Sequence, residues 1–207
     1  MKVFFKAIRD YDLEKVKNYV NKKPELVNCV AKAPPKKDDG QSPLQVAFKT
    51  ANFEIAEFLI SKGADVNYIE TESINNWRIP VLHDAIRACV FNSRYSVLNL
   101  RKTDDGFENI YEIETTKEEF TEALKGLKKL IEYDVNVNAE DSYGNDAFCR
   151  LITDIDQITD KKRHTQELTE DLNELISTLF TAGLKIKPNP DYKEYHSELF
   201  ELISLEI

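Results

Sequence analysis

The clearest pattern of apolar positions lies between Ser42 and Asn67, in SPLQVAFKTANFEIAEFLISKGADVN. Apolar residues recur at helical spacing in two short groups, which are Leu44, Ala47 and Phe48, then Ile55, Ala56, Leu59 and Ile60. Ser42 and Pro43 are typical of the first positions of a helix, and Gly63 is suited to end the second helix in a left-handed conformation. The pattern predicts a helical hairpin.

The same pattern recurs along the chain. The ending LISKGADVN (59–67) is matched by LIEYDVNVN (130–138) and LFTAGLKIK (179–187), and the start SPLQVAF (42–48) by PVLHDAI (80–86) and DAFCRLI (146–152). Residues 4–28 form a degenerate copy. Because one such unit cannot bury its apolar face alone, consecutive units should stack. We expect a single domain over 1–207, with repeats at about 1–30, 37–69, 75–140 and 141–188 and a closing helix at 189–207.

The third unit contains 33 more residues between its two helices than the second unit does. This insertion, residues 93–116, has β-favouring runs on both sides of a DDG sequence, which predicts a projecting hairpin or a long loop. A collapsed extra repeat is the alternative, since 33 residues is also a repeat length. The fourth unit has 16 extra residues, and we expect longer helices there, joined by the charged turn DKKRH (160–164).

The segment GQSPLQVAFKTANFEIAEFLISKGADVN (40–67) resembles an ankyrin repeat, whose family pattern is DxxGxTPLHxAAxxGxxxxVxxLLxxGADVN. The resemblance implies an all-α solenoid of helical hairpins with turn or β-like connections. It would contain about four repeats, a C-terminal capping helix and one long insertion in the third repeat. His83 stands at the position of the family's histidine, which implies a structural role for its imidazole. The equivalent residues are Gln45 and Cys149.

The resemblance also implies that the turn tips and the inner helices face one concavity and bind a protein there. The variable turn positions of three successive repeats give nine candidate contact residues: Asp38, Asp39, Gln41, Asn76, Trp77, Ile79, Ser142, Tyr143 and Asn145. Asp39, Trp77 and Tyr143 occupy equivalent positions, and aromatic residues are enriched at interface hot spots. The alternative for Trp77 is that it packs beneath the loop 68–79.

Composition limits the kind of partner. The net charge of −9 and the lack of a dense basic stripe argue against nucleic acid and favour a protein with a basic surface. No apolar run approaches the roughly 20 residues that cross a membrane, and the first residues do not resemble a signal peptide, so a cytoplasmic monomer is expected. The three cysteines, Cys29, Cys89 and Cys149, lack CxxC spacing and are predicted to be free thiols that bind no metal.

No phosphate-binding, nucleophile-elbow or zinc-protease motif occurs in the sequence, so we expect no catalytic residues and no cofactor. The leading hypothesis is a noncatalytic module that binds a protein through its concave face and its inserted segment. One alternative is an inhibitor or immunity-type protein that neutralises a basic enzyme or toxin. A second is an enzyme with its site in the insertion, around Tyr95, Arg101, Glu112 and Glu114. A structural, oligomer-forming role is the third.

Overall fold

The computed structural model describes residues 1–71, 73–158 and 164–187. Its α-helices are α1 (Lys2–Arg9), α2 (Leu13–Lys22), α3 (Pro43–Lys49), α4 (Phe53–Ser61), α5 (Val81–Phe91), α6 (Lys117–Glu132), α7 (Ala147–Ile158) and α8 (Gln166–Thr181). Two short 3-10 helices span Pro24–Asn28 and Lys36–Asp38, and two strands, β1 (Ser96–Thr103) and β2 (Gly106–Ile113), form a hairpin. The predicted closing helix at 189–207 and most of the DKKRH turn lie outside the described residues.

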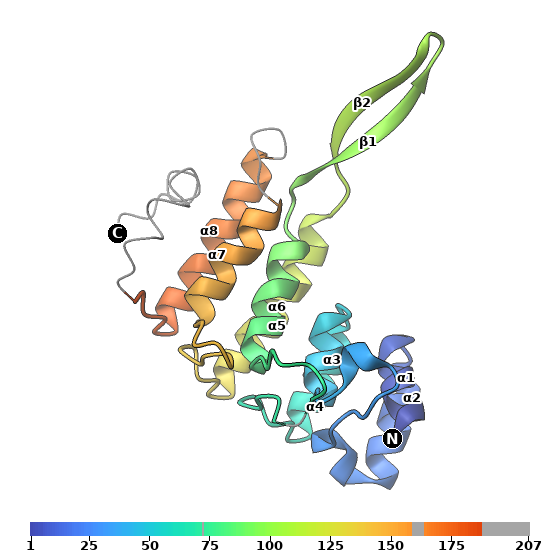
Figure 1. The fold of residues 1–207 in the computed structure, drawn as a ribbon, viewed down its shortest axis with the longest axis vertical. Coiled ribbons are helices and arrows are strands. Elements are labelled where there is room, and N and C mark those ends of the chain that lie inside the picture. The colour runs from blue at the N-terminus through green and yellow to red at the C-terminus, as the bar shows by residue number, and fades with distance from the viewer. Residues whose placement is uncertain (72, 159–163, 188–207) are drawn as a thin grey trace.

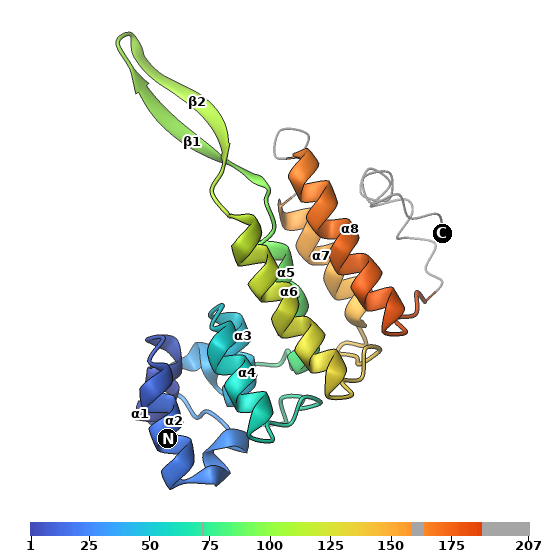
Figure 2. The same ribbon diagram turned by 180° about the vertical axis from the view of Figure 1, so that it is seen from behind.

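The helices form two rows (Figures 1 and 2). Helices α1, α3, α5 and α7 contact one another in sequence along the first row, and α2, α4, α6 and α8 do so along the second. We call these the odd row and the even row. The predicted apolar faces meet between the rows, where Leu44, Phe48, Ile55 and Leu59 are almost completely buried. Stacking of neighbouring helix pairs therefore provides the core that one pair lacks.

The start and the end of the clearest unit follow the sequence prediction. Ser42 caps α3, because its Oγ accepts the N–H of Gln45 at 3.2 Å while the Gln45 Oε1 accepts the N–H of Ser42 at 3.0 Å. Gly63 follows α4 with a φ of 85°, which confirms the predicted left-handed conformation. Asp134 and Gly183 follow α6 and α8 with φ of 59° and 95°. Three units thus end in the same backbone conformation.

A repeated pair of asparagine hydrogen bonds links the ends of successive units, and we call it the asparagine ladder. Asn28, Asn67 and Asn138 donate their side-chain amides to the carbonyls of Gly63, Asp134 and Gly183, at 2.9, 3.1 and 3.0 Å. Their side-chain oxygens accept the N–H groups of residues 65, 136 and 185. Each asparagine therefore satisfies one donor and one acceptor at the end of the next even-row helix.

The insertion forms the projecting hairpin, and the collapsed extra repeat is therefore wrong. Strand β1 pairs antiparallel with β2, with Ser96 opposite Ile113 and Thr103 opposite Gly106, and the hairpin extends away from the helices (Figure 1). This small sheet also corrects the all-α class, because the fold is mostly helical with one two-stranded ribbon. Helices α7 and α8 are longer than α3 and α4, as the extra residues of the last unit predicted.

Candidate protein-binding surface

A hollow of about 840 Å³ lies on the odd row, and we call it the central hollow. Its walls come from α3, α5, α7 and the turns that precede α5 and α7. They include Lys49, Asp84, Arg87, Arg150, Trp77 and Tyr143. The hollow therefore brings side chains from three consecutive helix pairs to one place.

Trp77 and Tyr143 border this hollow as exposed aromatic residues. The Trp77 side chain is 43% exposed, and its Nε1 donates to Asp141 Oδ2 at 2.6 Å. The Arg150 guanidinium lies 5.2 Å from the centre of the Trp77 ring. Trp77 is thus held at the rim by residues of the next unit and does not pack beneath the 68–79 loop. Tyr143 is 66% exposed.

Hydrogen bonds between the two turns fix the spacing of these aromatics. The Ser142 N–H donates to the Arg78 carbonyl at 3.0 Å, and the Arg78 N–H donates to Ser142 Oγ, also at 3.0 Å. Ser142 Oγ in turn donates to the carbonyl of the exposed Asn76 at 3.1 Å. Four predicted residues, Asn76, Trp77, Ser142 and Tyr143, therefore form one connected, exposed edge.

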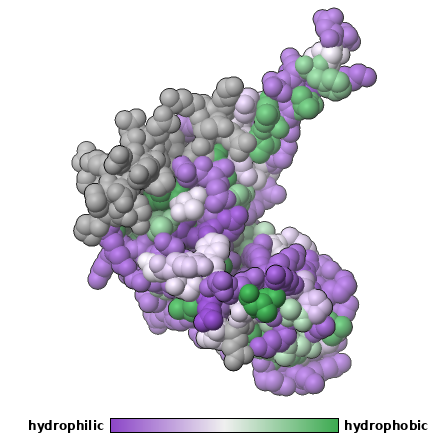
Figure 3. Space-filling view, in the orientation of Figure 1, coloured by the Kyte–Doolittle hydropathy of each residue, from purple (hydrophilic) through white to green (hydrophobic). Residues whose placement is uncertain are grey.

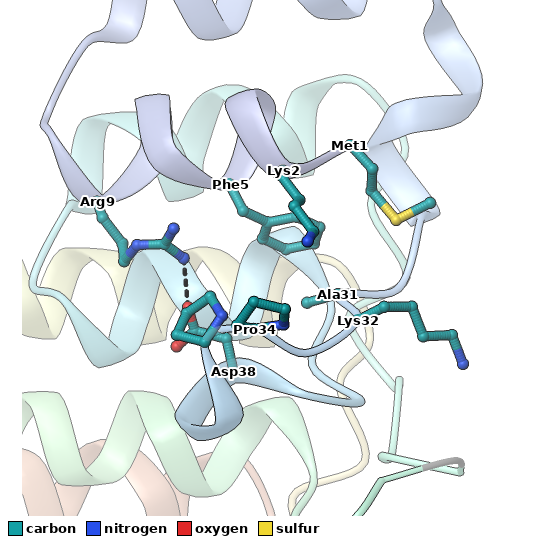
Figure 4. Close-up of a pocket in the computed structure, with 9 residues that line it drawn as sticks. Met1, Lys2, Phe5, Arg9, Ala31, Lys32, Pro34 and Asp38 are labelled. Atoms are coloured by element: carbon teal, nitrogen blue, oxygen red, sulfur yellow. Dashed lines mark hydrogen bonds and ion pairs between the residues drawn. The ribbon is translucent and has the colours of Figure 1, made fainter.

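The three candidates of the second unit are buried instead. Asp38 pairs with Arg9 at the edge of a small hollow of about 130 Å³ near the N-terminus (Figure 4). Asp39 accepts the N–H groups of Ile74 at 2.8 Å and Ala33 at 2.7 Å, which lower the pKa of its carboxyl. Gln41 donates to the buried Glu70 at 3.0 Å. These side chains hold loops together, and Asp39 does not extend the aromatic row on the surface.

The last two candidates are partly buried. The carbonyl of Ile79 accepts the side-chain N–H of Gln45 at 2.9 Å, which ties the second unit to the third. The Asn145 side-chain amide donates to Asp141 Oδ2 at 3.0 Å and so stabilises the turn that carries Tyr143. Both residues thus position the rim of the hollow.

Asp84 is a residue of the hollow that the sequence analysis missed. Its side chain comes from α5, lines the central hollow and is only 3% exposed. Its Oδ2 has no donor among the described protein groups. Burial raises the pKa of the Asp84 carboxyl to about 7. The sequence feature that could have identified Asp84 is its alignment with Val46, because an acid at a position that is buried and apolar in another unit is unusual. The prediction considered only the turn positions.

His83, beside Asp84, has the structural role that its position implied. Its Nε2 lies 3.2 Å from the Ala139 carbonyl oxygen, so Nε2 carries the proton, since that oxygen can only accept. In the second unit the equivalent residue is Gln45, whose side-chain oxygen accepts the N–H of Ser42, the residue that caps the helix. The third unit has Pro80 there, which has no N–H, and no other group of the described residues donates to the Nδ1 of His83. Burial lowers the pKa of His83 to about 4.

Three basic side chains of the central hollow already have acceptors. Arg87 Nη1 donates to Asp154 Oδ1 at 2.6 Å, and Arg150 Nε donates to Asp154 Oδ2 at 2.6 Å. Lys49 donates to Gln41 Oε1 at 3.0 Å and lies 3.8 Å from Asp38. Their charges are therefore directed toward acids other than Asp84.

The ribbon presents a second exposed surface. The strand register places five large apolar side chains on one face, and all five are exposed: Leu98, Leu100, Phe107, Tyr111 and Ile113. We call this the apolar ribbon face. Figure 3 shows apolar side chains along the projecting hairpin, between its hydrophilic tip and the body of the molecule. The opposite face is mostly polar and carries the Arg101–Glu108 ion pair at 2.6 Å.

The residues suggested for an enzymatic site in the insertion do not gather around a cavity that the structure describes. Tyr95 packs against the helical core, whereas Arg101, Glu112 and Glu114 lie on the exposed hairpin and the residues after it. Glu112 and Glu114 accept the side-chain amide of Asn99 at 3.5 and 3.0 Å. These contacts are those of a solvated ribbon.

The cysteines are free, as predicted, with Cys89 fully buried and Cys29 and Cys149 partly buried. Within residues 1–71, 73–158 and 164–187, no three His, Cys, Asp or Glu side chains come together in a way that would hold a metal ion. In the same part of the chain, none of the helices has the length and apolar character needed to span a membrane.

Comparison with known proteins identifies the unit that carries the clearest sequence pattern. Residues 39–70 match the family model of the ankyrin repeat, and they include α3, α4 and Gly63. No curated protein matches the chain. The capped helix, the short turn, the second helix and the left-handed glycine are the features of the matched segment. Residues 39–70 therefore form an ankyrin repeat, which is the one repeat that the family model matches.

Proposed function

We propose that this protein is a noncatalytic module that binds another protein through its central hollow and its projecting ribbon. Ankyrin repeats are generally protein–protein interaction modules, and residues 39–70 form such a repeat. The observation that carries the proposal is the exposed edge of Trp77 and Tyr143 beside the central hollow. Large aromatic side chains held rigidly beside a concave surface are typical of interface hot spots.

The proposal treats the four helix pairs as an ankyrin-type solenoid with repeats at about 1–30, 37–69, 75–140 and 141–188. Support comes from the two helix rows, the three left-handed helix ends and the asparagine ladder, which recur from unit to unit. A solenoid of this kind holds its surface residues at fixed spacing, because each unit packs on its neighbours. The partner then meets a preformed surface.

An inhibitor that neutralises a basic enzyme or toxin is the second candidate. The projecting ribbon favours it, since the ribbon carries an apolar face and a turn with Asp104 and Asp105, in a protein with a net charge of −9. A narrow acidic projection is complementary to a basic cleft. In this version the partner is an enzyme whose cleft the ribbon enters.

The test is affinity capture from an extract of the source cells, with quantitative mass spectrometry of the retained proteins. Three variants are compared with the natural protein: Trp77→Ala with Tyr143→Ala, replacement of residues 97–112 by a short Gly-Ser linker, and Tyr133→Ala. Tyr133 is a matched control, because it is an exposed aromatic residue at the end of α6 on the even row. Circular dichroism verifies that each variant is folded.

We expect a partner that the natural protein and the Tyr133 variant retain and that the double aromatic variant loses. Truncation of a hot-spot aromatic weakens binding by roughly 2 kcal/mol or more. Loss with the linker variant alone places the contact on the ribbon. Equal retention by a folded double variant and a folded linker variant contradicts the proposed binding surface.

A further inference from the structure

We propose that the central hollow receives an arginine side chain of the partner and that Asp84 is the buried acceptor for its guanidinium. This inference rests on the proposed function and names the chemistry of the group that the hollow selects.

The hydrogen bonding of Asp84 is incomplete in the free protein. Its side chain is almost fully buried, and the Gln45 side chain is a hydrogen-bonding neighbour of the carboxyl, yet no group in the described part of the chain donates to its Oδ2. A buried acceptor without a donor destabilises a fold, so residues of this kind are rare unless they serve another purpose. The fold itself does not require an acid here, because the equivalent position on α3 is Val46. Asp84 is therefore better explained as a group that binds a ligand than as a group that stabilises the packing of α5.

The neighbouring basic residues do not complete this site. Arg87 and Arg150 are both directed to Asp154, and Lys49 is directed to Gln41 and Asp38. Glu70, the other acid of the hollow, accepts from Gln41. Two acceptors of the hollow thus lack a donor among the described residues, the neutral Nδ1 of His83 and the Oδ2 of Asp84, and of these the Asp84 carboxylate is the one that carries a charge.

The aromatic rim favours a planar cation. The Arg150 guanidinium already lies over the Trp77 ring, which shows that the rim accepts this geometry, and the Tyr143 ring is two-thirds exposed on the same edge. Guanidinium groups stack on aromatic faces and donate several hydrogen bonds in a fixed fork. An incoming arginine would therefore contact a ring and donate to Asp84 with the same group.

Other side chains fit the hollow less well. A carboxylate and an apolar group both lack a donor, so either would leave the Asp84 Oδ2 without a partner. A neutral amide would supply a donor without the charge. Lysine would supply the charge without the planar fork. These differences define the probes of the test.

The experiment uses the fluorescence of Trp77, which is the only tryptophan of the chain and borders the hollow. The 207-residue protein is titrated at about pH 8, above the pKa of Asp84, with the acetylated and amidated tripeptide Gly-Arg-Gly at constant ionic strength. Parallel titrations use Gly-Lys-Gly, Gly-Gln-Gly and Gly-Glu-Gly. The variants are Asp84→Asn, Asp84→Val and Asp105→Asn. The last removes one negative charge from the exposed hairpin turn and leaves the hollow unchanged.

We expect a saturable fluorescence change that is strongest with the arginine peptide. Asp84→Asn should weaken its binding by about tenfold or more, and Asp105→Asn should leave it unchanged. Asp84→Val should also raise the melting temperature by roughly 2–8 °C, because an apolar side chain replaces the incompletely paired acid. The inference is overturned if the arginine peptide gives no saturable change, if the glutamine peptide binds equally, or if Asp84→Asn binds the arginine peptide as tightly as the natural protein does.

The captured partner separates this inference from the proposed function. If Asp84→Val still retains a partner that the double aromatic variant loses, the binding surface stands and the arginine assignment fails. If neither variant loses a partner while the arginine peptide still requires Asp84, the pocket chemistry stands and the proposed function fails.

Discussion

Gly63 shows how one backbone conformation ends a unit. A Cβ added at Gly63 would meet no atom within 4 Å, so the space around it does not select glycine. The backbone φ of 85° selects glycine, because a residue with a side chain is strained in this left-handed region. Asp134 occupies the equivalent position after α6 with a φ of 59°, and therefore carries the strain that Gly63 avoids. The two positions form a natural pair for measuring its cost.

We predict that Gly63→Val lowers the free energy of unfolding by about 1–2 kcal/mol and that Asp134→Gly raises it by up to about 1 kcal/mol. The first change introduces a β-branched residue at positive φ, and the second removes an exposed side chain from the same conformation. Urea denaturation followed by circular dichroism measures both. An unchanged denaturation midpoint for Gly63→Val would contradict the strain argument.

The buried acid makes a prediction about pH. Because burial raises the folded-state pKa of Asp84 to about 7, the contribution of Asp84 to stability is greatest at low pH and is lost as the pH rises through 7. The free energy of unfolding of the Asp84→Asn variant, minus that of the natural protein, should therefore increase between about pH 4 and pH 8. Comparing the two proteins cancels the opposite effect of His83, whose pKa is lowered to about 4. A difference independent of pH would refute the assignment.

At the scale of elements, the asparagine ladder couples units that are far apart in sequence. The Asn67 side chain, at the end of the second unit, donates to the carbonyl of Asp134, 67 residues away at the left-handed end of α6. It also accepts the N–H of Asn136. We expect Asn67→Ala to cost about 1–2 kcal/mol, since two backbone groups lose their partners. Asn109→Ala on the exposed ribbon is the control and should change little. Chemical denaturation of both variants checks this, and equal stabilities would argue against the ladder.

The ribbon is an element that the helical body does not need. A lone two-stranded hairpin is marginally stable in water, and this one pairs mainly with itself. Replacing residues 97–112 by a short Gly-Ser linker should therefore shift the melting temperature by only a few degrees. A change of roughly 1 kcal/mol in the free energy of unfolding has this effect in a chain of this size. Hydrogen exchange of the natural protein should be fastest on the two strands. Loss of the helical circular dichroism signal in the linker variant would show that the ribbon supports the body.

At the scale of the whole molecule, sequence patterns predicted elements better than they predicted surfaces. Local signals such as the Ser42 cap, Gly63 and the DDG turn lie within a few residues of what they determine, so the helices and the hairpin followed from them. The burial of Asp39 depends on N–H groups of Ala33 and of Ile74, and the latter lies 35 residues away. The alignment put Asp39 in register with Trp77 and Tyr143 but could not show that other loops cover it.

Asp84 was missed for a related reason. Its environment comes from α3, α7 and the 70–79 segment, and the ion pair that directs Arg87 toward Asp154 joins α5 to α7. Such contacts depend on how neighbouring units stack, and a degenerate repeat does not specify them in its own sequence. The faces of the ribbon, in contrast, follow from strand alternation once the register is known.

The charge of the whole chain bears on its association state. The apolar ribbon face is an obvious surface for self-association, but two copies would each bring a net charge of −9. We predict a monomer at low ionic strength, because this repulsion is then weakly screened. Size-exclusion chromatography with light scattering measures the mass, and a dimer that is lost on Leu100→Asp would reverse the prediction.

The closeness of the two ends of the insertion has a practical consequence. Thr115 Oγ1 donates to the Ser93 carbonyl at 2.7 Å, so the chain leaves α5 and returns to α6 at nearly the same point. Any peptide whose own termini lie near each other satisfies this junction, whatever its length or internal structure. The turn between α5 and α6 is therefore a suitable graft site, and the protein can serve as a scaffold that displays foreign loops.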